Sequence, residues 1–269
     1  MKSGAVPGRG TSFLGSLAIQ RRVIHALLMR EVITRFGRHN IGVLWLVGEP
    51  MMFTLGVAAL WASAGLSHNS SLPIISFAIT GYSSVLMWRN SVSRTNSSIH
   101  QNFNLLFHRN VRMIDVFLTR IVLELAGATG SFIALALFFT LGEWVPPPED
   151  LLKVVQGWLM LAWFGTALSL TIGAATAYSE IVDRLWHPVS YLLFPLSGAA
   201  FMVEWLPKGG QDVVLLLPMV HGVEMVREGY FGNSVHTHYD LGYMAACCLG
   251  LTLLGLFLVR DAGRRLESR

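Results

Sequence analysis

The residue types that carry catalysis occur in this chain of 269 residues, but not at the spacings that enzymes use. A P-loop nucleotide hydrolase needs a Gly-rich loop ending in Gly-Lys-Ser/Thr, and the sequence has no Gly-Lys dipeptide. There is no Gly-x-Ser-x-Gly elbow and no pair of carboxylates suited to glycoside chemistry. We therefore expect a protein that is not an enzyme and that hydrolyses no nucleotide by itself.

Metal and redox chemistry are not indicated either. The histidines do not follow a metalloprotease pattern, and no Cys/His spacing is typical of zinc. Cys247 and Cys248 are neighbours in the chain, which rarely satisfy the geometry of a disulfide. The sequence predicts no metal site and no cofactor bound by this chain.

Glu49 is the ionisable residue whose position most favours a function, because it stands in an apolar run directly before Pro50. A proline kinks a helix and frees a backbone carbonyl, so this pair could mark a bend beside a transport pathway. The alternative is a structural carboxylate paired with Arg89 or Arg120. Glu124, one turn after Arg120, is expected to pair with that arginine.

Aromatic residues in apolar runs could stack on the faces of sugars in such a pathway, although such rings more often contact lipid or the protein core. The candidates are Phe53, Phe77, Tyr82, Tyr191, Phe194 and Phe201.

The elements that must position these residues are membrane helices. Apolar residues make up 53% of the chain and charged residues 13%, about half the charged share of a soluble domain. A helix needs about 20 apolar residues to cross the hydrocarbon core. Six uncharged or nearly uncharged runs approach that length: 41–62, 72–88, 121–141, 157–177, 185–203 and 241–259.

Positive charges orient these six predicted spans. Fifteen of the 20 Lys and Arg residues fall on one side of the membrane, whereas Lys208 and Arg227 fall on the other. Lys and Arg concentrate in cytoplasmic loops, so both termini are predicted to be cytoplasmic. Without the weakly apolar 72–88 run, the Arg-rich 91–113 loop would lie on the wrong side.

Two segments do not read as simple spans. Residues 14–36 mix apolar residues with arginines, which predicts an amphipathic helix in the cytoplasmic interface or a solvated helix packed on the protein. The 204–240 segment is too long for a turn, and its apolar run is too short to cross. It predicts re-entrant short helices on the outer side. The expected organisation is a tail and interfacial helix over 1–40, a six-helix domain over 41–259 and a tail over 260–269.

Small residues recur every four positions in the fourth predicted span, at Gly165, Ser169, Gly173 and Ala177. This stripe lets helices approach closely, either within one chain or between two copies.

The segment from Arg30 to Pro50 resembles the permease subunit of ABC-2 type polysaccharide exporters, most closely the capsular polysaccharide exporters of Gram-negative bacteria. The residues that carry the resemblance are Arg30-Glu31, Arg35-Phe36-Gly37, Gly42, Trp45 and Glu49-Pro50. A cytoplasmic loop agrees through Asn102, Leu105, Arg109, Val111, Arg112, Ile114, Asp115 and Arg120. A Pro-x-x-His-x-x-Glu-x-x-Arg segment agrees through Pro218, His221, Glu224 and Arg227.

The resemblance implies an all-α ABC-2 type transmembrane domain in the bacterial inner membrane. It implies two permease copies and two separate ATP-binding subunits, which hold ATP and Mg²⁺. A lipid-linked capsular polysaccharide would move outward through the dimer, and an adaptor for polysaccharide export would be a further partner. Related alternatives are a permease for O-antigen, teichoic acid or another glycolipid, and a drug-efflux or lipid-efflux permease. A membrane enzyme of glycolipid synthesis is a more distant alternative.

The resemblance also implies roles for particular residues. The loop at about 91–113 would couple to the ATPase, with residues 179–184 as a second contact; the candidates are Asn102, Leu105, Arg109, Arg112, Asp115, Glu180 and Arg184. Arg30, Arg35 and Arg38 would meet the phosphate of a lipid head, since guanidinium binds phosphate in a bidentate fork. Attraction to anionic lipid would explain them equally. The pathway candidates are Glu49, Phe53, Tyr82, Tyr191 and Phe201.

Overall fold

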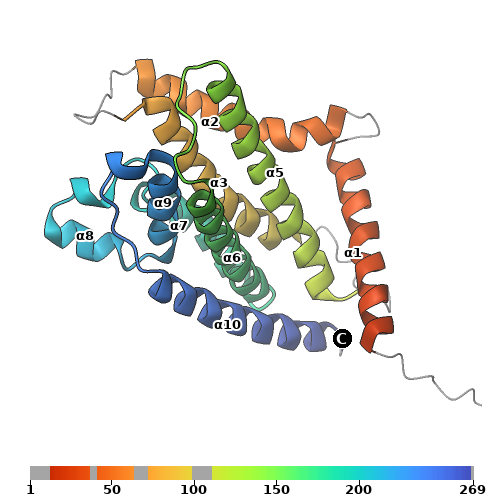
Figure 1. Ribbon diagram of the computed structural model, residues 1–269. Coiled ribbons are helices and arrows are strands. Elements are labelled where there is room, and N and C mark those ends of the chain that lie inside the picture. Colours follow the sequence, from red (N-terminus) through yellow and green to blue (C-terminus); the bar gives the residue numbers. More distant parts are fainter. Residues whose placement is uncertain (1–12, 37–40, 64–71, 99–110, 268–269) are drawn as a thin grey trace, which may run out of the picture.

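The computed structural model describes residues 13–36, 41–63, 72–98 and 111–267, and all regular elements in these ranges are helices (Figure 1). Four helices are long and apolar enough to cross a membrane: α2 (Ile41–Ser63), α5 (Met113–Leu141), α6 (Leu151–Thr176) and α10 (Leu241–Glu267). They coincide with four of the six predicted spans. The predicted spans 72–88 and 185–203 correspond to α3 (Ile74–Asn96) and α7 (Glu180–Leu196), which are helices but do not reach that apolarity or length.

α3 is the central helix, in contact with α2, α5, α6, α7 and α9 (Pro218–Phe231). Most of its residues are buried, including many hydroxyl side chains. Thr80, Ser84, Ser91 and Thr95 each donate a hydrogen bond to the carbonyl four residues earlier. These hydroxyls are satisfied within the helix, so α3 can be polar because protein rather than lipid surrounds it.

The stripe of small residues on α6 brings that helix against α3 within one chain, which settles the question that the sequence left open. A Cβ atom at Gly165 would lie 3.1 Å from the Cα of Trp88, and one at Gly173 would lie 2.7 Å from Cγ2 of Thr95. Ser169 is buried between them, whereas Ala177 at the end of the stripe is exposed. The missing side chains therefore set the distance between α3 and α6.

α7 is a largely exposed helix, in which Trp186 and Ser190 are the buried residues. Pro188 and Pro195 both lie inside it. Trp186 donates from Nε1 to the hydroxyl of Ser93 on α3 at 3.2 Å. The rest of α7 presents apolar side chains to the surroundings of the single chain.

The segment after α7 folds into short helices, as predicted: η1 (Val203–Trp205), α8 (Lys208–Val214), α9 and η2 (Gly232–Ser234). The longest, α9, is almost entirely buried and packs on α6, α3 and α10. A backbone hydrogen bond of 2.8 Å from Asp150 to Gly229 joins the start of α6 to α9.

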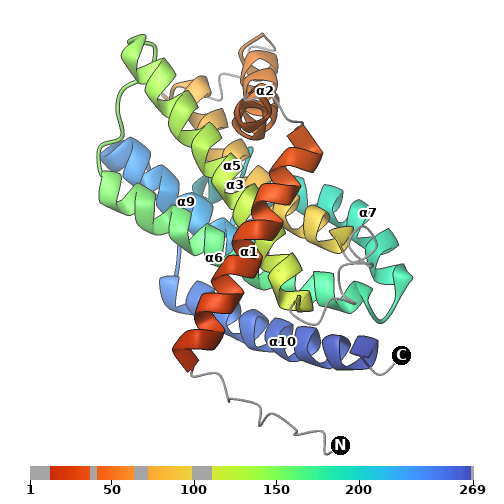
Figure 2. The ribbon, with the colours of Figure 1, turned by 90° about the vertical axis from the view of Figure 1, so that its right-hand side faces the viewer.

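α1 (Phe13–Phe36) lies across one side of the bundle, against α5 and α2 (Figures 1 and 2). Its apolar residues do not gather in one stripe, contrary to a simple amphipathic pattern: Leu17, Met29 and Ile33 are exposed. The side of α1 that faces the bundle carries polar Gln20 and Glu31. Each has a partner on α5, Asp115 and Arg120 respectively.

Helix ends differ from the predicted spans where polar residues continue a helix. α5 begins eight residues before position 121, and α10 continues past residue 259 to Glu267. In that extension Arg265 pairs with Asp261 one turn earlier at 2.9 Å. Apolarity alone marks the part of a helix that suits lipid, not the whole helix.

Candidate functional site

Two polar clusters lie at opposite ends of the bundle, and each contains residues that the sequence singled out. We call the end at which α1 packs the α1 end; it includes the last turn of α3 and the first turns of α5. The α9 end includes the first turn of α6 and the 197–240 segment.

Arg227 is the centre of the cluster at the α9 end. Its side chain is fully buried and donates to the carbonyl of Ala199 at 2.7 Å and to the carbonyl of Phe201. The guanidinium also lies over the ring of Phe77 on α3, 3.8 Å from its centroid. Gly81 makes room for this arrangement, since a Cβ there would lie 2.7 Å from the guanidinium.

Glu224 and His221 bind other parts of the same segment to α9. Glu224 accepts hydrogen bonds from the backbone N–H of Val203 and of His238. His221 accepts at Nδ1 from the backbone N–H of Asp240 at 2.9 Å, so its Nε2 carries the proton and donates to the carbonyl of Leu215 at 2.8 Å.

We call His221, Glu224 and Arg227 the α9 clamp. Pro218, the first residue of their motif, is the first residue of α9, where its missing N–H costs nothing. The clamp binds backbone groups of residues 199–203, 215 and 238–240, and so holds this segment against α9.

The cluster at the α1 end is an ionic network across four helices, which we define by Glu31, Glu49, Arg94, Arg120 and Glu124. Arg94 on α3 pairs with Glu49 on α2 at 3.1 Å and approaches Glu124 on α5 at 3.7 Å. Arg120 on α5 pairs with Glu31 on α1. Glu49 is thus part of an ion pair, as the structural alternative predicted.

The partner of Glu49 was not foreseen. Arg94 lies 45 residues away along the chain, and nothing in the local sequence connects the two. Glu124 was expected to pair with Arg120; the structure places it 3.7 Å from Arg94 on α3, while Arg120 pairs with Glu31 on α1.

The coupling candidates in the described part of the chain lie where α5 begins. Asp115 is buried and caps α5 by accepting from the backbone N–H of Arg112 at 3.0 Å. It also accepts from Nε2 of Gln20 on α1 at 2.9 Å. Arg112 itself is exposed. Asp115 therefore fixes the helix start, whereas Arg112 is free to face a partner protein.

The remaining coupling and lipid-head candidates are only partly described. Glu180 and Arg184 form an exposed pair one helical turn apart at 3.3 Å. Arg30 is exposed on α1. The side chain of Arg35 and the residues Asn102, Leu105, Arg109 and Arg38 lie outside the described part of the structure.

The structure brings two of the predicted pathway aromatics together. Tyr82 on α3 makes an edge contact with Phe194 on α7, with 5.6 Å between ring centroids. Tyr191 on α7 lies beneath the guanidinium of Arg89 on α3, at 4.3 Å. Phe53 on α2 is 58% exposed. The carbonyl of Phe201 accepts a hydrogen bond from Arg227 of the α9 clamp.

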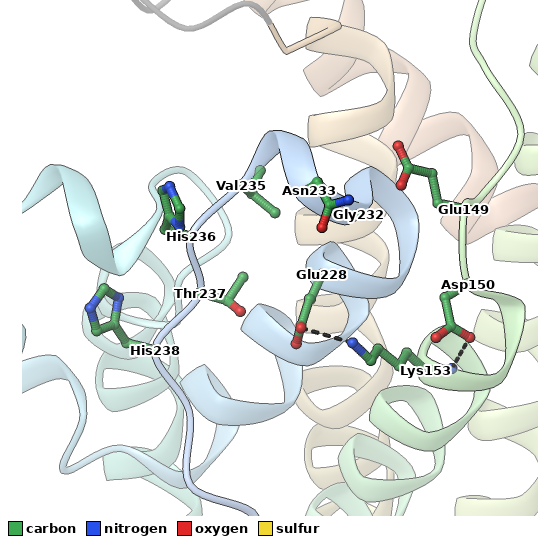
Figure 3. A pocket seen from close by; sticks show the side chains of 10 residues that line it. All are labelled: Glu149, Asp150, Lys153, Glu228, Gly232, Asn233, Val235, His236, Thr237 and His238. Atoms are coloured by element: carbon green, nitrogen blue, oxygen red, sulfur yellow. Dashed lines mark hydrogen bonds and ion pairs between the residues drawn. The ribbon is translucent and has the colours of Figure 1, made fainter.

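An open pocket of about 580 Å³ lies at the α9 end, between the start of α6 and the chain after α9 (Figure 3). Lys153 and Glu228 point toward each other across it and pair at 2.9 Å, with His236 and His238 on the opposite side. Burial and a hydrogen bond to Glu228 raise the pKa of Tyr239 to about 12. Within the described residues, no group of His, Cys, Asp and Glu side chains could hold a metal ion.

Comparison with known proteins agrees with this picture of a helical membrane protein. The chain matches the model of the ABC-2 type transporter family over residues 22–231. It is 44% identical to the capsule polysaccharide export inner-membrane protein CtrC of Neisseria meningitidis serogroup B over 260 residues, which cover 96% of this chain and 98% of CtrC.

Two other relatives extend the comparison. The capsule polysaccharide export inner-membrane protein BexB of Haemophilus influenzae is 42% identical over 262 residues, 97% of this chain and 99% of BexB. The polysialic acid transport protein KpsM of Escherichia coli is 25% identical over 245 residues, 90% of this chain and 94% of KpsM.

Proposed function

Because this chain belongs to the ABC-2 type transporter family, we propose that it is the membrane subunit of an exporter that moves lipid-linked capsular polysaccharide across the bacterial inner membrane. The observation that carries the proposal is identity of 42–44% with two capsule polysaccharide export proteins along nearly the whole of both chains. Such similarity from end to end covers the spans and the loops between them.

The proposed topology has six spans, α2, α3, α5, α6, α7 and α10, with both termini in the cytoplasm. The enclosure of α3 supports its inclusion, because a polar helix can lie in a membrane when other helices shield it. α7 has 17 residues and is about 25 Å long, slightly less than the thickness of the hydrocarbon core. It can still span the membrane if the polar segment that follows it is buried in protein. In this topology the α1 end is cytoplasmic, and α8 and α9 form the re-entrant part on the outer side.

The chain acts as a non-catalytic subunit in this proposal. Two copies form the pathway, and two ATP-binding subunits hold ATP and Mg²⁺ and perform the hydrolysis. The exposed apolar face of α7, with Leu185, Val189 and Leu192, is suited to a second copy. An envelope-spanning adaptor on the outer side completes the assembly.

The α1-end network suits the transmission of movement from the ATPase. The 91–113 segment joins the end of α3 to the start of α5, and both helices are tied to their neighbours beside this segment. Arg94 connects α3 to α2 and α5, and Arg120 connects α5 to α1. A push on the loop is thus shared by four helices, including α1, whose Arg30 and Arg35 would receive the lipid head together with Arg38, which follows α1 in the sequence.

A gene deletion tests the function in the native host. The deletion should remove surface capsule, with the lipid-linked polymer accumulating inside the cell, and the wild-type gene should restore export. Intact capsule with sensitivity to amphiphilic drugs would indicate an efflux permease, and loss of O-antigen or teichoic acid would indicate another glycolipid.

Purification tests the division of labour. An ATP-binding subunit should co-purify with this chain, and lipid-linked polysaccharide should stimulate its ATPase activity in proteoliposomes. A complex whose ATP-binding subunit lacks the phosphate-loop lysine is the matched control and should be inactive. Glycolipid turnover by this chain without any ATPase subunit would contradict the proposal.

A further inference from the structure

Arg89 is a charged residue of α3 that belongs neither to the ionic network at the α1 end nor to the α9 clamp. It lies on α3, seven residues before the helix ends at Asn96, which is about 10 Å along the axis. Side chains on a helix tilt toward its N-terminus, and the N-terminus of α3 lies at the α9 end. The side chain of Arg89 is partly buried, and its guanidinium lies over the exposed ring of Tyr191 on α7.

Among the residues that the structure describes, no carboxylate forms an ion pair with Arg89. This distinguishes it from Arg94 and Arg120, which pair with acidic residues on neighbouring helices. Arg89 directly follows the predicted 72–88 span, at the boundary of the membrane in the proposed topology. A cation so close to the hydrocarbon core is costly unless a partner compensates it. In the described part of the chain, Arg89 contacts the ring of Tyr191, with 4.3 Å between the guanidinium carbon and the ring centroid.

The surroundings of Arg89 are open on one side. Tyr191 is 64% exposed and belongs to α7, the helix with only two buried residues. Tyr82 lies two turns before Arg89 on α3, close enough to feel its charge, and contacts Phe194. Tyr191 covers one face of the guanidinium, and no acceptor among the described residues binds its in-plane N–H groups, which can therefore donate to a ligand.

We propose that Arg89, Tyr191 and Tyr82 form a binding site for an anionic group, a phosphate or a carboxylate, carried by the exported glycolipid. This inference rests on the proposed function and adds a substrate property to it. Guanidinium offers two parallel N–H donors to either anion, and Tyr82 adds a hydroxyl donor. The exposed ring of Tyr191 provides a face on which a neighbouring sugar stacks. A neutral glycan would use the rings but would leave the arginine uncompensated.

The test uses the complete complex in proteoliposomes of zwitterionic lipid, with ATPase stimulation as the readout. The probes are short glycolipids of equal length: one with a phosphate linker and neutral sugars, one with a neutral linker and acidic sugars, and one that is neutral throughout. The variants are Arg89→Gln, Arg89→Lys and Tyr191→Phe, with Arg260→Gln as a control that removes an exposed arginine from α10.

Arg89→Gln should raise the half-stimulating concentration of an acidic probe by about tenfold or more, the usual effect of losing a charge-assisted hydrogen bond. The response to the neutral probe should not change. Arg89→Lys should recover part of the loss, and Tyr191→Phe should keep the cation–π contact. The acidic probe that shows the shift identifies the group as linker phosphate or sugar carboxylate.

An equal shift for acidic and neutral probes, or no shift, would overturn the inference. It would also be overturned if anionic phospholipid vesicles competed with the acidic probe in the wild-type complex and not in Arg89→Gln, because membrane lipid would then be the ligand. If no glycolipid stimulates even the wild-type complex, the proposed function itself fails, so the two failures are distinguishable.

Discussion

The ion pair between Glu49 and Arg94 predicts a specific pattern of energetic coupling. Glu49 is either a pathway residue or a structural partner, and a double-mutant cycle with Glu49→Gln, Arg94→Gln and the double variant separates these roles. The paired atoms lie 3.1 Å apart, with side-chain exposures of 27% for Glu49 and 41% for Arg94. Such partial exposure reduces the contribution of the pair to about 1 kcal/mol.

The single variants should differ in size. Arg94→Gln also removes the 3.7 Å contact with Glu124, whose side chain is only 6% exposed, and a buried carboxylate that loses part of its compensation adds to the cost. Glu49→Gln leaves the Arg94–Glu124 contact in place and should cost about 1 kcal/mol. In the Arg94→Gln background the further cost of Glu49→Gln should be smaller than in the wild type, because the ion pair is already absent.

The assay is the thermal midpoint of the purified complex in detergent, together with the amount of protein in the membrane and the export of polymer. About 1 kcal/mol corresponds to roughly 2–4 °C for a chain of this size. Additive effects of the two substitutions would refute the pairing. Full loss of export by Glu49→Gln at wild-type stability, also in the Arg94→Gln background, would instead place Glu49 in the pathway.

The remaining predictions concern packing, coupling and pH. Gly165→Val should destabilise the complex by about 1–3 kcal/mol or more, because the new side chain overpacks the contact between α3 and α6. Gly250→Ala is the control and should be nearly neutral, since a Cβ atom there has no neighbour within 4 Å. Folded yield and thermal midpoint measure both effects. Reversing the charges of Arg109 and Arg112 should abolish export at a normal protein level, and unchanged export would remove their loop from coupling. The raised pKa of Tyr239, about 12 when folded, contributes stability below pH 10 that is lost as pH rises toward 12. The stability deficit of Tyr239→Phe relative to wild type should therefore shrink over this range, as measured by denaturation at each pH.

The helices were largely predictable because the membrane imposes length and apolarity on them. The runs at 41–62, 121–141, 157–177 and 241–259 all lie within helices that can cross a membrane. α3 required a different argument, from the placement of charges, because its serines and threonines face other helices. An apolar sequence marks a helix that contacts lipid, and a central helix such as α3 has little contact with lipid.

The contacts between helices were not predictable to the same degree. The resemblance to the exporter family pointed to His221, Glu224 and Arg227, but not to the backbone groups that they bind. Gln20 meets Asp115 across 95 residues, and Glu49 meets Arg94 across 45. Such pairs depend on how each helix is rotated about its axis, which packing sets and local sequence does not record.

The distribution of these polar contacts also explains why α7 differs from the rest of the bundle. The α1-end network joins α1, α2, α3 and α5, and the α9 clamp holds the outer segment against α9. Among the described residues, the hydrogen bond between side chains of α7 and another helix is that of Trp186 to Ser93 on α3; the other contacts of α7 with α3 and α6 are packing and ring contacts. Buried polar contacts resist displacement more than apolar contacts do, because separating them leaves unpaired groups. α7 is therefore the helix that can shift with the least cost while the remaining bundle keeps its contacts. In a dimer that faces its partner across α7, such a shift changes the width of the space between the two copies and carries Tyr191 with it, toward or away from Arg89.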